Sequence, residues 1–128
     1  MSTITGTAER NCRERRLALQ DTIQALGGKW RIFILCALQN GDLRFSDLET
    51  RLPGIRPKVL ASDLKSLEAH LLVNRQVNPT RPVTVTYSLT PHARHLWPLV
   101  DALVGFGLEH RRSVKAGMKA DNAHVIPL

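Results

Sequence analysis

The sequence predicts a mainly helical α+β fold in one domain, because 128 residues is a usual length for a single domain. Apolar residues recur with the helical period of about 3.6 as far as residue 71, and then alternate with a period of two between residues 73 and 89. A helical pattern returns after residue 90. The net charge of +7 suits a polyanionic partner, with nucleic acid favoured over an anionic membrane surface.

The N-terminal third predicts a polar arm followed by two helices. Residues 1–11 are mostly small and polar and are expected to form a flexible arm. A first helix is expected from about residue 13 to residue 26, and Gly27-Gly28 ends it. A second helix over 29–38 is apolar on every side, which predicts that it is the central, buried helix.

Two start signals predict a short third helix and a longer fourth helix. Ser46 and Glu49 have the spacing of a capping box, and the helix that they open should end near Leu52. Pro57 suits the first turn of the next helix. Four leucines with helical spacing are expected to form its buried stripe, namely Leu60, Leu64, Leu67 and Leu71.

The alternating segments predict a β-hairpin after the fourth helix. One strand is expected over 73–77 and the other over 83–89, with a proline-bounded tip between them. Thr90-Pro91 then predicts the start of a last helix. That helix is expected to run to about residue 112, with a bend or local break at Pro98.

The last helix carries more apolar surface than one domain could cover. Its apolar residues form two stripes, and one of them can pack on the domain. The other needs a partner, because a large apolar patch is seldom left exposed, and a symmetric dimer is the simplest answer. The candidate dimer residues are Leu96, Trp97, Val100, Leu103, Val104 and Leu108.

The order of these elements is that of a winged helix-turn-helix. In this design the second helix of the pair enters the major groove of DNA, and the hairpin reaches the backbone or the minor groove. The predicted organisation is therefore a flexible arm over 1–11, a winged-helix DNA-binding domain with flanking dimerisation helices over 12–112, and a C-terminal tail over 113–128.

Two groups of residues are the candidates for DNA contact, although each residue could instead be ordinary solvated surface. The first group lies on the exposed face of the fourth helix, whose N-terminal end would reach base edges. The second group is basic and would contact phosphates or the minor groove. The base-contact candidates are Lys58, Val59, Ser62 and Ser66, and the phosphate candidates are Arg56, Lys65, Arg75 and Arg81.

Cys12 is a candidate redox-sensing residue. It lies at the predicted start of the first helix in an arginine-rich segment, and both features favour the thiolate that oxidants attack. The alternative is an incidental cysteine without a sensing role. Cys36 lies in the apolar second helix and is expected to be inert.

Other chemistry is not expected from this sequence. We find no nucleophile with a base and orienting group and no glycine-rich phosphate loop, so the sequence does not predict an enzyme or a cofactor. His92 and His95 have the spacing of two metal ligands, but no third ligand is evident, so we expect surface histidines. Because no export signal or membrane span is visible, we expect a cytoplasmic protein without a membrane partner.

Four segments lie in an informative order: LGGKW at 26–30, NGDLRFSDL at 40–48, LPGIRPKVLASDLKSLE at 52–68 and VTYSLTPHAR at 85–94. Together they resemble the HxlR-type winged-helix transcriptional regulators, relatives of the MarR-type group, over about residues 12–108. The resemblance implies a homodimeric bacterial DNA-binding regulator that dimerises through its terminal helices. It also implies a possible sensor, because several members sense oxidants or electrophiles through a cysteine that aligns with Cys12.

Three positions depart from the family pattern. Arg56 replaces a Ser or Thr that often caps the fourth helix, a cap worth about 1 kcal/mol. Asp63 stands where a basic residue is common, and a carboxylate on the DNA-facing side would repel phosphate. Leu71 stands where glycine often follows the recognition helix. These departures leave the predicted fold intact and the operator sequence open.

The sequence therefore predicts a homodimeric regulator that binds double-stranded DNA at an operator with two-fold symmetry. An unidentified small-molecule effector could bind between the first and last helices, as in MarR-type relatives. The alternative is a winged-helix module that binds another protein and has no specific DNA site.

Overall fold

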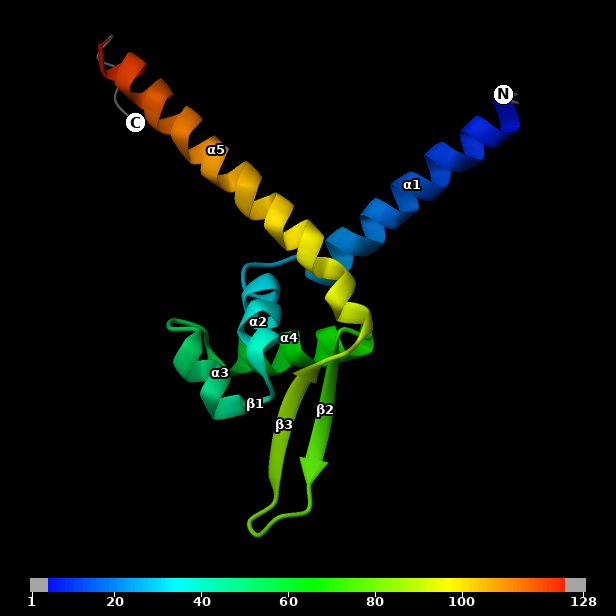
Figure 1. The fold of residues 1–128 in the computed structure, drawn as a ribbon, viewed down its shortest axis with the longest axis vertical. Coiled ribbons are helices and arrows are strands. Elements are labelled where there is room, and N and C mark those ends of the chain that lie inside the picture. Colours follow the sequence, from blue (N-terminus) through cyan, green and yellow to red (C-terminus); the bar gives the residue numbers. More distant parts are fainter. Residues whose placement is uncertain (1–4, 124–128) are drawn as a thin grey trace. The chain divides into compact units, whose positions relative to one another are not determined.

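The computed structural model describes the backbone of residues 5–123 and the side chains of residues 9–118. The chain forms two compact units, which divide after Ala93 (Figure 1). The first unit holds the helices α1 (Thr5–Leu26), α2 (Arg31–Ala37), α3 (Phe45–Arg51) and α4 (Pro57–Ala69) and the strands β1 (Leu43–Arg44), β2 (Val73–Asn78) and β3 (Thr84–Leu89). The second unit holds α5 (Trp97–Ala123).

The core of the first unit is built from α2, α3, α4 and the start of β2. Each buried leucine or isoleucine there contributes roughly 2 kcal/mol by leaving water. The prediction that α2 is central is confirmed for Ile34 and Leu35, but Phe33 is 56% exposed. The fully buried side chains are Ile34, Leu35, Leu48, Leu60, Leu64, Leu67 and Val73.

The third helix begins one residue earlier than Ser46, and the predicted capping box is wrong. The N-cap of α3 is Arg44, whose backbone N–H donates to the Asp47 carboxylate at 3.0 Å. An aspartate at the third helical position therefore satisfies the free backbone donor that the prediction had assigned to Glu49. Ser46 instead lies inside the helix, where its carbonyl accepts from the Thr50 hydroxyl at 3.0 Å.

The fourth helix begins at Pro57 as predicted and ends in a Schellman motif. The Leu71 N–H donates to the Glu68 carbonyl at 3.0 Å, and the Leu72 N–H donates to the Leu67 carbonyl at 2.9 Å. This places Leu71 at the left-handed position, with φ of 63°. The prediction that Leu71 completes the buried stripe is therefore wrong, and Leu72 enters the core in its place.

The predicted hairpin is confirmed and belongs to a three-stranded antiparallel sheet in the order β1-β3-β2. Asn78 pairs with Thr84 next to the tip, and Val73 pairs with Leu89 at the other end. The short strand β1 was not predicted, because two residues are too few to show an alternating pattern. Its Leu43 pairs with Tyr87 on β3 and so ties the start of α3 to the hairpin.

Thr90 connects the end of the sheet to the recognition helix. Its hydroxyl donates to the Leu71 carbonyl at 2.7 Å and accepts from the Ala93 N–H at 3.1 Å. The predicted N-cap role of Thr90 is thereby confirmed. The segment that it caps, His92–Leu96, is a 3-10 helix, and α5 begins one residue before Pro98.

Both terminal helices are longer than predicted. Residues 5–11 continue α1, where an arm was expected, and residues 113–123 continue α5, where a tail was expected. Neither segment contains proline, and neither carries the buried apolar period on which the prediction relied. Residues 1–4 of the arm and 124–128 of the tail lie outside the described residues. No helix in the described part of the chain is long and apolar enough to cross a membrane.

Candidate nucleic-acid interface

The pair α3 and α4 is joined by a tight turn that fixes the direction of α4. Leu52 and Ile55 are buried, and the Ile55 N–H donates to the Leu52 carbonyl at 3.1 Å. Gly54 between them has φ of 94°, a conformation that favours glycine. Since the turn is pinned at both apolar residues, α4 must bury its leucine stripe and turn its opposite side to solvent.

That opposite side carries most of the predicted base contacts. Lys58, Val59 and Ser62 are all exposed on the first two turns of α4, as expected for residues that reach base edges. Ser66, predicted for the same face, is half-buried. Arg56 is exposed at the N-cap of α4, and because a guanidinium has no acceptor for the free N–H groups there, it makes no side-chain capping bond.

Asp63 does not face solvent in the way that the sequence suggested. Its carboxylate accepts from Nε of Arg31 at 3.3 Å, and the two side chains are only 16% and 19% exposed. Residue 63 lies at the border between the buried and exposed sides of α4, where a neighbour from α2 reaches it. The expected repulsion of phosphate is therefore offset by the adjacent guanidinium.

The recognition helix and the wing meet around a hollow of about 210 Å³. Lys65 from α4 and Arg75 from β2 both line it, so the structure brings together two of the predicted phosphate contacts. Tyr87 and Glu68 also line it and were not predicted. The pairing of Arg75 with Tyr87 across the hairpin was the available signal, because cross-strand partners share one face of a sheet.

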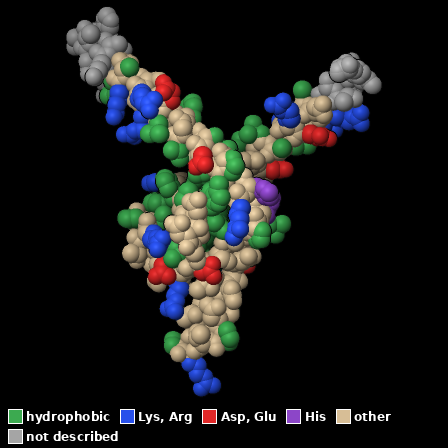
Figure 2. Space-filling view, in the orientation of Figure 1, with side chains coloured by type: hydrophobic (Ala, Val, Ile, Leu, Met, Phe, Trp, Pro, Cys, Tyr) green, Lys and Arg blue, Asp and Glu red, His purple; other side chains and the backbone are tan. Residues whose placement is uncertain are grey.

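The tip of the wing is ordered by polar side chains. Nδ2 of Asn78 donates to the hydroxyls of Thr84 at 3.2 Å and Thr86 at 3.3 Å, and the Thr80 hydroxyl donates to the Pro82 carbonyl at 2.8 Å. Arg81 lies in this turn and is exposed. Figure 2 shows a basic side chain at the free end of the hairpin. The wing therefore presents its cation on a braced turn.

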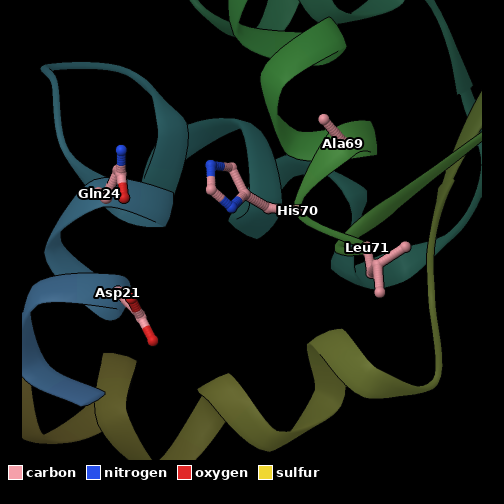
Figure 3. A pocket seen from close by; sticks show the side chains of 5 residues that line it. All are labelled: Asp21, Gln24, Ala69, His70 and Leu71. Atoms are coloured by element: carbon pink, nitrogen blue, oxygen red, sulfur yellow. The ribbon is translucent and has the colours of Figure 1, made fainter. Parts of the chain in front are cut away.

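A second hollow, of about 330 Å³, lies between the C-terminal half of α1 and the end of α4 (Figure 3). Asp21 and Gln24 line it from α1, and His70 and Leu71 line it from the end of α4. A carboxylate, an amide and an imidazole line it together with the apolar side chains of Ala69 and Leu71, so its wall is mixed. The small-molecule effector expected from the sequence stays a prediction.

The two cysteines differ in their surroundings. Cys12 is exposed, but α1 begins seven residues before it, so the prediction that it lies at a helix N-terminus is wrong. Four arginines stand near it along the chain, at positions 10, 13, 15 and 16. Cys36 is half-buried on α2, and burial raises the pKa of its thiol, which favours the neutral thiol over the thiolate. In the described part of the chain, no cluster of three or more His, Cys, Asp or Glu residues could hold a metal ion.

Both terminal helices expose apolar side chains (Figure 2). On α1, Leu19 and Ile23 are each 61% exposed. On and just before α5, three predicted dimer residues are exposed and three are half-buried: Leu103, Val104 and Leu108 belong to the first group, and Leu96, Trp97 and Val100 to the second. Phe106, which was not predicted, is also exposed and stacks on His110 at 5.5 Å between ring centroids. Phe106 follows Leu99 by seven residues and Leu103 by three, so it continues the predicted stripe of Leu96, Leu99 and Leu103, and its spacing was the signal that could have found it.

A helix pair, a tight turn and a following two-stranded wing define a winged helix-turn-helix protein, as the sequence predicted. The family model of the HxlR-like helix-turn-helix matches residues 25–115. The chain therefore belongs to the HxlR-like family, whose named members are transcriptional regulators.

Known proteins of this kind are similar in sequence and in fold. An uncharacterised HTH-type transcriptional regulator of Methanothermobacter thermautotrophicus is 38% identical over 90 residues, which are 70% of this chain and 69% of the relative. The crystal structure of the HTH-type regulator ytcD superposes with a TM-score of 0.71 and 35% identity, and the match covers 73% of this chain and 96% of ytcD. The redox regulator HypR in its reduced form also gives a TM-score of 0.71, with 30% identity over 77% of this chain and 98% of HypR.

Proposed function

We propose that this protein is a sequence-specific DNA-binding regulator that acts as a homodimer on an operator with two-fold symmetry. The observation that carries the proposal is the basic surface where α4 meets the wing. Exposed Lys58 and Ser62 lie on the outer side of α4, and Lys65 and Arg75 line one hollow beside it, where two cations outnumber the single carboxylate of Glu68. A surface of this kind supports base readout by the helix and phosphate binding by the wing.

Each part of this surface has a distinct role in the proposal. Lys58 and Ser62 hydrogen-bond to base edges in the major groove, and Val59 contacts a thymine methyl group. Arg56, Lys65 and Arg75 bind the phosphates on either side of that groove, with the Tyr87 hydroxyl as a further donor beside Arg75. Arg81 reaches the next phosphate or the minor groove from the tip of the wing. Ser66, which is half-buried, is the weakest base-contact candidate.

The terminal helices supply the dimer in this proposal. Residues 9–20 of α1 are all exposed, and a helix without packing partners is only marginally stable in water. The apolar side chains that α1 and α5 expose therefore need a cover, and a second copy offers the same surface in return. Each half of the operator would take one α4, with half-sites about one helical turn, or a multiple of it, apart.

The redox role of Cys12 is a further part of the proposal. HypR, one of the similar structures, is by its name a redox regulator. Cys12 is exposed on α1, seven residues before the exposed Leu19 and so on the same helical face, and oxidation there would change the subunit contact and hence the spacing of the two recognition helices. The half-buried Cys36 takes no part in this response.

Fluorescence anisotropy tests the DNA-binding function directly. The purified protein is titrated into a labelled duplex of about 30 base pairs from upstream of its own gene and into a scrambled duplex of the same composition. If the dimer makes about 6–10 phosphate contacts, affinity should fall roughly 10³- to 10⁵-fold between about 50 and 200 mM salt. A mild thiol oxidant is then added to the wild type and to Cys12→Ser.

Four results would separate the alternatives. Tight binding to the upstream duplex alone supports a regulator that works on chromosomal DNA in the cytoplasm. Weak and equal binding to both duplexes favours a winged helix that binds another protein, and a selection from random duplexes would then decide the matter. An oxidant response that Cys12→Ser abolishes supports the sensor, and a response that persists in Cys12→Ser contradicts it.

A further inference from the structure

Arg31 connects three helices of the first unit through a single guanidinium. Its Nε donates to the Asp63 carboxylate on α4 at 3.3 Å. Its Nη1 donates to two backbone carbonyls near the end of α1, Gln24 at 3.0 Å and Ala25 at 3.3 Å. Arg31 itself is the first residue of α2 and is 19% exposed. The side chain therefore forms a bridge from α1 to the recognition helix.

The chemistry of the bridge suits a guanidinium and no other side chain. The last turn of α1 leaves carbonyls without intrahelical donors and carries the negative end of the helix dipole. The planar fork of arginine reaches these carbonyls and the Asp63 carboxylate at once, which the compact ammonium of lysine could not do. At the first position of α2 a cation is unfavourable for that helix. Arg31 is therefore explained by what it holds rather than by helix α2.

Beside the bridge, the space between α1 and α4 is not filled by side chains. The hollow lined by Asp21 and Gln24 on one side and by Ala69, His70 and Leu71 on the other separates the two helices beside the bridge (Figure 3). Among the described side chains of α1 only Leu26 is buried, and one buried side chain does not set the angle between two helices. The charged bridge adds a second, directional point of attachment.

We propose that Arg31 is a positioning residue for DNA recognition, because it fixes α4 relative to α1 and so sets where each recognition helix meets its half-site. The inference rests on the proposed function, in which α1 contributes to the dimer and α4 reads the bases. In a dimer whose subunits are joined through the terminal helices, the position of each α4 relative to its own α1 determines the distance between the two α4 helices. Without the bridge, the distance between the two α4 helices varies more from molecule to molecule. Affinity for an operator with two half-sites then falls, whereas affinity for random DNA does not.

Anisotropy measurements on a set of variants, with a control that matches the charge change of Arg31→Ala, test the bridge. Arg31→Ala and Asp63→Ala each break it from one end, and Arg31→Lys keeps the charge without the fork. Arg112→Ala is the matched control, since Arg112 forms an exposed ion pair with Glu109 at 2.9 Å, away from α4 in the sequence. All variants are titrated into the upstream or selected duplex and into the scrambled duplex, and thermal melting confirms that they are folded.

We expect Arg31→Ala, Arg31→Lys and Asp63→Ala each to weaken operator binding about tenfold, with less than twofold loss on the scrambled duplex. The double variant Arg31→Ala/Asp63→Ala should be no weaker than Arg31→Ala, because both changes remove the same bridge. Arg112→Ala should change both duplexes equally. If Arg31→Ala weakened and Asp63→Ala strengthened binding, the two residues would act by charge alone and the proposal would be overturned. Equal losses on both duplexes would overturn it as well.

A measurement without DNA separates this inference from the proposed function. The Nε–H resonance of Arg31 in the free protein should move on Asp63→Ala and stay in place on Arg112→Ala. If it moves but no duplex is preferred, the bridge exists, and both the DNA-binding function and its positioning role fail together. If it does not move, the bridge is absent and the inference alone fails.

Discussion

Leu71 occupies a backbone position that suits glycine. Its φ of 63° lies in the left-handed region, which costs a side-chain-bearing residue about 1–2 kcal/mol. The Schellman bonds of Leu71 and Leu72 hold it there, and its side chain is 69% exposed, so little burial offsets the cost. The departure from the family pattern noted in the sequence therefore coincides with a local strain.

Leu71→Gly should stabilise the protein. Relief of the strain outweighs the extra entropy that glycine gives the unfolded chain, about 0.5–1 kcal/mol, so the free energy of unfolding should rise by roughly 0.5–1 kcal/mol. Urea denaturation measures the change. Ala69→Gly, two residues earlier in the helix, is the matched control and should lower stability by about 1 kcal/mol. A loss of stability in Leu71→Gly would mean that the leucine side chain is covered in the assembled protein.

Lys58 is the side chain that should distinguish base readout from charge. It is exposed in the first turn of α4, where a recognition helix reaches base edges. Lys58→Ala should weaken operator binding by about 1–3 kcal/mol and random-duplex binding much less, as anisotropy on both duplexes will show. Lys65→Ala, at another exposed lysine of α4, is the comparison. Because Lys65 is proposed to bind a phosphate, its loss should lower the affinity equally for both duplexes. Equal losses for Lys58→Ala would reassign it to the phosphates.

At the scale of elements, the sequence predicted the helices and strands whose periodic apolar residues are buried within the chain. The stripe of Leu60, Leu64 and Leu67 defined α4, and the alternating residues defined the hairpin, because in both cases the pattern matches one buried face. The ends of α1 and α5 were missed for the converse reason. The described side chains of their extra turns, at residues 9–11 and 113–118, are exposed, so periodicity carried no signal there.

The candidate site, like the fold, was predicted only in part. Exposed residues of α4 and the wing follow from the positions of the buried ones, so Lys58, Lys65 and Arg75 were found from the sequence. The partner of Asp63 was not, because a pairing with Arg31, 32 residues away, depends on how α2 crosses α4. The same holds for β1, whose two residues gain their strand character only from Tyr87 and Thr86 opposite.

We expect the braced turn of the wing to strengthen DNA binding by Arg81. Because Asn78, Thr80 and Thr84 brace the turn, Arg81 is held ready to bind without a large cost of ordering. Arg81→Ala should weaken binding to all duplexes and lower the slope of log affinity against log salt by about one for each subunit, or about two for the dimer. Asn78→Ala leaves Arg81 in place but removes the brace, so it should weaken binding with an unchanged slope. A loss confined to A·T-rich flanks would instead place Arg81 in the minor groove.

At the scale of the whole molecule, charge and exposed apolar surface point to the same assembly. A second copy doubles the net charge of +7, which strengthens attraction to DNA, while repulsion between the copies must be overcome by apolar burial. The exposed side chains of α1 and α5 supply that burial. Dimerisation and DNA binding should therefore depend on each other, since DNA neutralises the charge that opposes association.

Val104→Glu should break the dimer. Val104 is exposed on α5, and burying an unpaired carboxylate at a subunit contact costs several kcal/mol, enough to shift the protein to monomers at micromolar concentration. Light scattering after gel filtration measures the mass directly. Val77→Glu on the wing is the matched control, since Val77 is about as exposed but lies outside the terminal helices, and it should remain dimeric. A monomeric Val104→Glu that still bound the operator as tightly as the wild type would show that a single α4 and wing carry the recognition, and the two-fold operator would then be wrong.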